Sequence, residues 1–275
     1  MKLRYAYNTN GISSHRLDDA LAMLADHGYA GVALTLDHHH LDPFAPDFRP
    51  KLDALARRLE TLGLGLVVET GARFLLNPRR KHEPTLLHPE RAGRARRVEF
   101  LCRAIDVCAA GRGEAVSFWA GVSKVARVDA TTYLREGLEQ VLAYAEEKSV
   151  VVALEPEPGM LVETVADWRA LRASFPSLRL ALDLGHIIAN DEGDPAAFVR
   201  EARDELATVS LEDMKRGVHE HLWIGQGDVN FPSVLGALKD VGYERLVCLE
   251  LSRDSHRADT LVPEAIRLLR AMEPA

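Results

Sequence analysis

The 275-residue sequence lacks long hydrophobic runs and contains only three cysteines, and each absence argues against a class of protein. No stretch approaches the roughly 18 apolar residues of a membrane span. The first residues, MKLRYAYNTNG, lack the apolar core and cleavage site of a secretory signal. The cysteines, Cys102, Cys108 and Cys248, show no CxxC spacing, which argues against structural zinc and dithiol redox chemistry. We therefore expect a soluble, cytoplasmic protein with reduced thiols in its core and no membrane partner.

Positive charge is not in excess either, because the formal net charge is -7 and the basic residues are scattered instead of forming one block. A protein that binds duplex nucleic acid gains most of its affinity by neutralising phosphates with a basic face. This charge balance argues against a nucleic-acid partner, although it leaves room for a local basic pocket.

What the sequence does contain is an alternation of eight β-type runs with longer amphipathic stretches. The runs predicted as strands are Leu3–Tyr7, Gly31–Leu36, Gly65–Glu69, Ala115–Trp119, Val150–Glu155, Leu178–Leu182, Ala207–Leu211 and Leu246–Leu251. The stretches predicted as helices are Arg16–His27, Lys51–Leu62, Glu90–Ala110, Ala130–Lys148, Val165–Phe175, Pro195–Glu205, Pro232–Val241 and Pro263–Met272. Strict alternation implies parallel strands, because parallel neighbours need a crossover helix.

Two α/β folds satisfy this alternation, a closed barrel and an open doubly wound sheet. No glycine-rich phosphate loop follows the first run, and polar residues recur at the C-terminal end of nearly every run, which favours the barrel. A barrel of this type needs about 250 residues, which is nearly the whole chain. The sequence therefore predicts a single (β/α)8 TIM barrel domain over residues 1–275, with no accessory domain.

Three carboxylates stand at the ends of apolar runs: Glu155 ends VVVALE, Asp183 ends LRLALD, and Glu250 ends LVCLE. In a barrel, the C-terminal strand ends converge on one mouth, where three carboxylates repel each other unless a divalent cation neutralises them. We therefore predict a metal site. The alternative is that each carboxylate pairs with an arginine or caps the following helix.

The segment SLEDMKRGVHEHLWIGQGDVNF, which includes the end of the seventh run, is also rich in candidate ligands. Glu212, Asp213, His219 and His221 come just after the predicted strand. A His-x-His pair in a loop can bind zinc, manganese or cobalt. Histidines in exposed loops are also often solvated residues without a function, and His221 is the better candidate of the two.

The order of these elements resembles the xylose-isomerase-like superfamily of sugar isomerases and epimerases: Glu after strand five, Asp-x-x-His after strand six, Gly-x-Gly-Asp-x-x-Phe in the seventh unit, and Glu after strand eight. The resemblance implies that Glu155 and Glu250 bind a metal and exchange protons with the substrate, and that Asp183 is the ligand between them. It implies that His186 contacts substrate, or a further metal as in an apurinic-site endonuclease of the superfamily. His221 would match a ligand of that endonuclease, and so, less securely, would the neighbouring histidine of the pair.

One position departs from the superfamily, whose seventh strand normally ends in His-x-x-Asp with the histidine as a ligand. The matching stretch here is Ser210, Leu211, Glu212 and Asp213. Serine is a poor neutral ligand, so either three carboxylates and water hold the ion, or Glu212 or His221 takes the open position. The expected ion is Mn, Mg, Co or Zn, with a shift toward harder ions such as magnesium or manganese.

Further residues are expected to bind the substrate, a small sugar or sugar phosphate. The loop after the third run starts at Glu69 and carries Arg73 and Lys81, and Arg216 follows the seventh run. Such cations clamp a phosphate or carboxylate, unless they belong to a solvated charged loop. Trp119 ends the fourth run and is a candidate wall for stacking a sugar, although tryptophan at a barrel mouth is as often simple packing.

The expected reaction removes a proton from the carbon beside a carbonyl while a metal stabilises the enediolate, and a carboxylate on each face removes and returns the proton. Glu155 and Glu250 would flank the sugar. Alternatives are a lyase that resembles the inosose dehydratases, a zinc phosphodiesterase that uses His186, His219 and His221, and a degenerate barrel without activity. Barrels of this kind often pair, so the sequence leaves a homodimer open.

Overall fold

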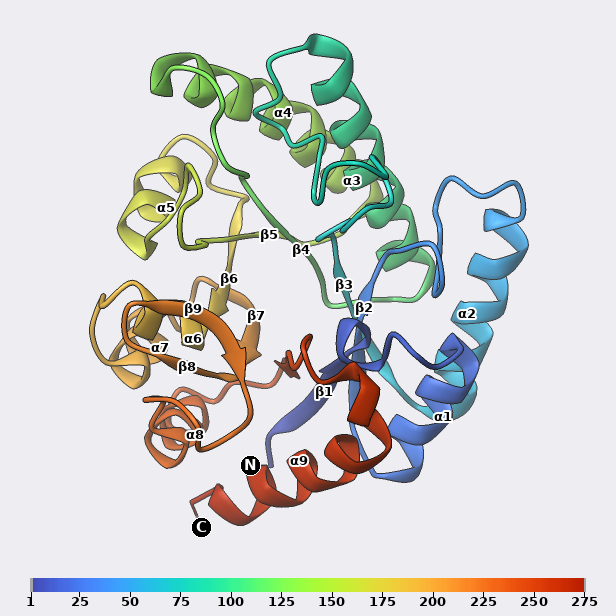
Figure 1. Cartoon of the computed structure of the whole chain (residues 1–275), viewed down its shortest axis with the longest axis vertical. Helices are drawn as coiled ribbons and strands as arrows, with labels where there is room; N and C mark the ends of the chain where they lie inside the picture. The colour runs from blue at the N-terminus through green and yellow to red at the C-terminus, as the bar shows by residue number, and fades with distance from the viewer. Residues whose placement is uncertain (1, 275) are drawn as a thin grey trace.

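A computed structural model describes residues 2–274 of the chain, in which eight parallel strands close into one barrel (Figure 1). Around the barrel the strand order is β1-β10-β7-β6-β5-β4-β3-β2. The strands are β1 Arg4–Asn8, β2 Gly31–Thr35, β3 Gly65–Glu69, β4 Ala115–Trp119, β5 Val152–Glu155, β6 Arg179–Asp183, β7 Leu206–Leu211 and β10 Leu246–Leu249. The predicted single-domain (β/α)8 barrel is confirmed, and each predicted run overlaps its strand.

Helices surround the strands on the outside of the barrel, as Figure 1 shows. They are α1 Leu17–Asp26, α2 Phe48–Leu62, α3 Arg91–Ala110, α4 Arg127–Lys148, α5 Val165–Arg172, α7 Pro195–Glu201, α8 Phe231–Asp240 and α9 Ala258–Met272. Two 3-10 turns, η1 Thr9–Ile12 and η2 Ser255–Arg257, add to these. The predicted boundaries differ most at α9, which starts before Pro263 because the proline lies inside the helix instead of opening it.

Small apolar side chains fill the interior of the barrel and support the polar mouth. Side chains alternate between the two faces of a strand, so residues two positions beyond an inward-facing residue also face inward. The buried interior layers consist of Ala6, Ala33, Val67, Leu246 and Cys248 and of Ala115, Ala153, Ala181 and Ala207. The positions that follow these layers by two along their strands include Thr35, Glu69, Glu155, Asp183 and Glu250. The strand period thus directs polar groups into the mouth from several strands.

Two elements break the simple alternation, and the sequence patterns did not predict them. Helix α6, Leu184–Ala189, begins directly after β6, and its first turn is capped by Asp183. The second is an antiparallel hairpin of β8, Asp213–Lys215, and β9, Val218–Leu222, which lies against α6 (Figure 1). The hairpin follows β7 and brings its histidines to the mouth.

Asp213, which the sequence offered as a candidate ligand, instead ties the loop after this hairpin to the start of β8. Its side chain is fully buried and accepts hydrogen bonds from the backbone N–H groups of Gly225, Gly227 and Val229 at 2.9, 2.8 and 3.0 Å. A Cβ at Gly227 would collide with the Asp213 carboxylate. The Gly-x-Gly-Asp motif is therefore a structural feature of the seventh loop.

The cysteines and the helices agree with the first expectations as far as the structure tests them. All three cysteines are free thiols, with Cys108 and Cys248 buried and Cys102 half-buried. None of the helices in residues 2–274 has the length and apolar character needed to cross a membrane.

Candidate active site

A cavity of about 470 Å³ opens at the C-terminal ends of the barrel strands. Asp183, one of the nine residues predicted for the site, is buried beside it, with its Oδ2 3.8 Å from His186 Nε2. Closure of the barrel therefore assembles side chains that stand far apart in the chain. Seven further predicted residues line the cavity: Arg73, Lys81, Trp119, Glu155, His186, His221 and Glu250.

The ninth predicted residue, Arg216, does not reach the cavity. It lies in the turn between β8 and β9, where its side chain is 62% exposed and forms an ion pair with Asp191. Its backbone N–H donates to Asp228 Oδ2 at 2.9 Å, which fixes the turn. Because the hairpin leaves this turn in solvent, the expected contact between Arg216 and substrate is not present in this geometry.

Glu155, Asp183 and His186 form the most compact group of candidate metal ligands. Each offers one ligand atom, and these atoms lie within 4.8 Å of one another. Asp183 Oδ1 accepts the backbone N–H of His186 at 2.9 Å, so this carboxylate does cap the following helix. Its Oδ2 is nevertheless buried without a hydrogen-bond partner in the described part of the chain, which leaves it free to bind a cation.

Glu250 follows β10 and faces Glu155 across the mouth, since β6 and β7 separate their strands. Its Oε1 accepts a hydrogen bond from Asn10 Nδ2 at 2.8 Å. The amide of η1 therefore orients this carboxylate toward the cavity. Glu250 stands apart from the compact group, so a cation held by all three predicted carboxylates would require its side chain to turn inward.

Two further carboxylates line the cavity, and the sequence patterns did not assign them to the site. Glu69 ends β3, which pairs with β2 at Thr35, and Glu157 follows the fifth strand by two residues. Burial first, and then the charges of Glu250 and Asp183, raise the pKa of Glu69 and of Glu157 to about 8. The signal for Glu69 was present, because the run LGLVVE ends in a carboxylate like the fifth, sixth and eighth runs.

This acidic cluster has no lysine or arginine partner among the residues that the structure describes. None of its members forms an ion pair with a lysine or arginine anywhere in residues 2–274; their only charged contacts are with histidines. Burial, followed by the charge of Asp183, raises the pKa of Glu155 and of Glu212 well above the usual range. Protons or a metal ion must therefore neutralise the negative charge of this cluster. The members are Glu69, Glu155, Glu157, Asp183, Glu212 and Glu250.

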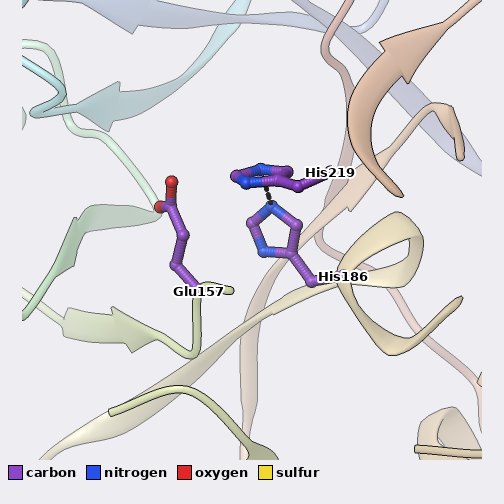
Figure 2. A group of neighbouring side chains, drawn as sticks. All are labelled: Glu157, His186 and His219. Carbon is purple, nitrogen blue, oxygen red and sulfur yellow. Dashed lines mark hydrogen bonds between the residues drawn. The ribbon is translucent and has the colours of Figure 1, made fainter. Parts of the chain in front are cut away.

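His186 presents a lone pair to the cavity. Its Nδ1 lies 3.1 Å from the carbonyl oxygen of Pro156, which can only accept, so Nδ1 carries the proton. Its Nε2 is then an acceptor and lies 3.1 Å from His219 Nε2, the contact drawn as a dashed line in Figure 2. Burial lowers the pKa of both His186 and His219, which favours the neutral rings.

Figure 2 shows Glu157 beside these two imidazoles, and the three residues form a second group whose ligand atoms lie within 4.8 Å. The ring of His221 is 5.8 Å from that of His219. The structure therefore brings one histidine of α6 and two of β9 to one wall, as the endonuclease-like alternative expects of His186, His219 and His221.

Trp119 forms part of the opposite wall, and its position depends on a buried arginine. The guanidinium of Arg97 lies 4.5 Å from the centre of the Trp119 ring system, and the ring of His82 meets it edge-on at 5.3 Å. Arg97 is fully buried and donates to the carbonyl oxygen of Thr70 at 2.9 Å. Burial lowers its pKa to about 9. No sequence pattern distinguishes Arg97, which supports the site, from the other arginines of α3.

The loop between β3 and α3 places Arg73 and Lys81 at the cavity. The backbone N–H of His82 donates to the Arg73 carbonyl at 2.5 Å, which closes the loop on itself. Arg73 Nη2 reaches the carbonyl oxygen of Asn10 at 3.4 Å. Ala72, Arg73 and His82 all have φ in the left-handed region, a strained conformation that is common near functional sites.

Comparison with known proteins agrees with this architecture. A family model described as "Xylose isomerase-like TIM barrel" matches residues 21–272. An uncharacterized protein of Methanocaldococcus jannaschii is 28% identical over 147 residues, which are 48% of this chain and 48% of that protein. The chain therefore matches about half the length of this curated relative.

Solved structures share the barrel over nearly the whole chain. The D-allulose 3-epimerase from Methylomonas sp. in complex with D-allulose is 20% identical, with a TM-score of 0.75 and coverage of 98% of this chain and 97% of that chain. An L-ribulose 3-epimerase is 20% identical, with a TM-score of 0.71 and coverage of 100% and 99%. An IolI protein with a bound zinc atom is 18% identical, with a TM-score of 0.73 and coverage of 98% and 96%. At this identity the likeness is one of fold.

Proposed function

Because the chain belongs to the xylose isomerase-like TIM barrel family, we propose that it is a divalent-metal-dependent isomerase or epimerase of a small sugar or sugar phosphate. The observation that carries this proposal is the acidic cluster at the mouth, which has no lysine or arginine partner in residues 2–274. Several solved structures with the same fold are named as sugar 3-epimerases, which supports the choice of substrate class.

The donor set fits a divalent cation. Asp183 Oδ2 is a buried oxygen without a hydrogen-bond partner among the described residues, and it lies in the compact group with Glu155 and His186. We propose Glu155, Asp183 and Glu250 as ligands, with His221, whose Nδ1 is also buried without a partner, as a nitrogen ligand. When bound, Mn, Mg, Co or Zn would stabilise negative charge on the substrate oxygens beside the reacting carbon.

Glu155 and Glu250 are the proposed proton carriers. They stand on non-adjacent strands, so a sugar between them presents opposite faces to the two carboxylates. One carboxylate removes the proton from the carbon next to the carbonyl, which leaves an enediolate, and the other returns a proton to the opposite face. Burial, followed by the charge of Asp183, raises the pKa of Glu155, which makes this carboxylate a stronger base than an exposed one and suits it to proton removal.

The rest of the cavity suits a monosaccharide with an anionic group. Its volume of about 470 Å³ is in the range of small-molecule sites, and its lining is polar. Trp119 offers a ring edge against which a sugar can pack, and a substrate hydroxyl would replace His219 as the donor to His186 Nε2. Arg73 and Lys81 line the same cavity and provide positive charge for a phosphate.

Solvent exchange tests this function directly. The manganese-loaded protein in deuterated water is incubated with a panel of ketoses, aldoses, inososes and their phosphates, and mass spectrometry measures deuterium at carbon. We expect exchange into at least one substrate, and a loss of about 100-fold for Glu250→Gln. Glu201→Gln, an exposed charge change on α7, is the matched control. A product lighter by one water would instead identify a lyase, and no exchange with any compound would refute the proposal.

A zinc phosphodiesterase is a second candidate because His186, His219 and His221 share one wall of the cavity. It requires more than one ion per chain. The net charge of -7 and the acidic mouth disfavour a nucleic-acid substrate. Metal analysis that finds a single ion per chain would remove this candidate.

The proposal also includes the cellular location and the oligomeric state of the protein. We propose a cytoplasmic location, which the free thiols Cys102, Cys108 and Cys248 support because reduced cysteines are usual there. We propose a homodimer as the state to test first. Light scattering coupled to size-exclusion chromatography measures the mass of the particle and decides between dimer and monomer.

A further inference from the structure

Glu212 is the most unusual carboxylate of the protein. It follows β7, is fully buried, and has no hydrogen-bond partner in residues 2–274 at either of its two oxygens. It is the only carboxylate of the described residues whose two oxygen atoms are both fully buried and without a hydrogen-bond partner. A charged group in this state is costly, so either a proton or a bound cation must neutralise it.

Two residues that lie beside Glu212 also have a buried atom without a hydrogen-bond partner, namely Asp183 Oδ2 and His221 Nδ1. His221 Nδ1 lies 3.9 Å from Glu212 Oε1. All of these atoms are of the types that bind metal ions, and they come from three separate elements of the mouth. Unpartnered ligand atoms from several elements that meet in one place indicate a cation site.

The backbone directs the Glu212 side chain into the barrel mouth and leaves space for it there. Ser210 pairs with Asp183 across β6 and β7, and Glu212 stands two residues beyond Ser210, so it extends the same inward-facing row. A Cβ at Gly185 would lie 2.5 Å from Glu212 Oε1, so the glycine of Asp-Leu-Gly-His leaves the space that the carboxylate occupies. The backbone N–H of Glu250 points to the carbonyl of Leu211 at 3.4 Å, which brings the last strand beside Glu212.

We propose that Glu212 is a metal ligand and occupies the position that Ser210 cannot fill. This inference rests on the metal site of the proposed function and specifies its composition. Together with the nitrogen of His221, carboxylates from four strand ends would hold the ion, namely Glu155, Asp183, Glu212 and Glu250, so oxygen ligands would dominate the site. Because carboxylate oxygens suit hard cations and imidazole nitrogens suit zinc, the site selects manganese or magnesium over zinc.

A shared proton is the competing explanation. Two facing carboxylates also coexist when one of them is protonated and donates to the other. Glu212→Gln separates the two explanations, since the glutamine amide replaces a protonated carboxyl as a donor to Asp183 but removes the anionic ligand. A shared proton predicts little change in metal affinity, whereas a ligand role predicts a large loss.

The test measures manganese binding by the full-length, metal-stripped chain, with electron paramagnetic resonance for free ion and calorimetry for affinity. We expect Glu212→Gln to weaken binding by at least about 100-fold, since even residues that only support a ligand cost 10- to 100-fold. Glu212→Asp, which keeps the charge on a shorter chain, should weaken it less. Glu201→Gln, on the outside of α7, should bind like the wild type.

A second arm tests selectivity. In Ser210→His with Glu212→Gln, one imidazole replaces one carboxylate, so the ratio of zinc affinity to manganese affinity should rise at least about 10-fold over the wild type. Unchanged manganese affinity in both Glu212 variants, with binding retained by the wild type, would overturn the ligand role alone. Absence of binding by the wild type would overturn the metal site of the proposed function as well. Thermal melting of the metal-stripped variants, monitored by circular dichroism, verifies that each is folded.

Discussion

Two walls of the cavity differ in how they are built. The acidic wall, formed by Glu155, Asp183 and Glu250, is set by strand ends whose inward direction follows from the period of the strand. The basic wall, formed by Arg73 and Lys81 with the aromatic ring of the fourth strand behind them, is set by a loop with strained backbone angles. Under the proposed function, the acidic wall would perform the chemistry on a frame set by the strands, and the basic wall, set by a loop, would bind the substrate.

The largest expected effect is on the acidic wall. Glu155→Gln removes both a ligand and a proton carrier, so we expect kcat for the best substrate of the exchange panel to fall about 1000-fold. Removal of metal with a chelator should abolish turnover in the wild type, and manganese should restore it. If Glu155→Gln keeps more than a tenth of the wild-type kcat, the acidic wall does not perform the chemistry as proposed.

The support of the basic wall should matter for stability more than for chemistry. Arg97→Met removes the guanidinium beneath Trp119 and leaves the buried carbonyl of Thr70 without its donor. We expect the free energy of unfolding to fall by about 1–3 kcal/mol, measured by urea denaturation. Arg97→Lys should not restore it, because an ammonium group does not stack on an indole as a planar guanidinium does. If the wild type, Arg97→Met and Arg97→Lys have the same free energy of unfolding, the buried arginine does not stabilise the protein.

Removal of the positive charge of Lys81 should affect substrate binding only. Lys81→Met should raise the KM for a phosphorylated sugar about 10-fold and leave the KM for the corresponding free sugar unchanged, because only the phosphate contacts the ammonium group. Steady-state kinetics with the pair of substrates measures this. If both KM values rise together, Lys81 shapes the loop instead of binding an anion.

The smallest effect concerns pH. The pKa of Glu69 is about 8 in the folded protein against an ordinary value of 4.5, so the folded state holds this proton more tightly than the unfolded state. Its contribution to the free energy of unfolding is complete below pH 4.5 and is lost as the pH rises through about 8. The melting temperature of the metal-stripped protein should therefore fall over this range, and Glu69→Gln should reduce the slope. A melting temperature that rises with pH would contradict the burial of an unpaired carboxylate.

The sequence predicted the fold and much of the acidic wall for one reason. Apolar runs that end in a carboxylate, as at Glu155, Asp183 and Glu250, combine a buried strand with a polar end, and parallel strands in a barrel present such ends to one mouth. Glu69 carried the same signal, but the basic residues that follow it led to a loop interpretation. Arg216 was selected by its place after the seventh strand, and the hairpin turned it into solvent.

The features that could be predicted are therefore those that follow the backbone repeat. They are the eight strand and helix units and the inward direction of the strand-end carboxylates, because side-chain direction follows that repeat. Contacts between units that no local pattern links depend on the folded barrel and could not be predicted. Arg97 beneath Trp119, the three bonds of Asp213 and the unpartnered oxygens of Glu212 all depend on which elements the closed barrel brings together. Burial and pairing are properties of the assembled molecule, and they decide which carboxylate needs a cation.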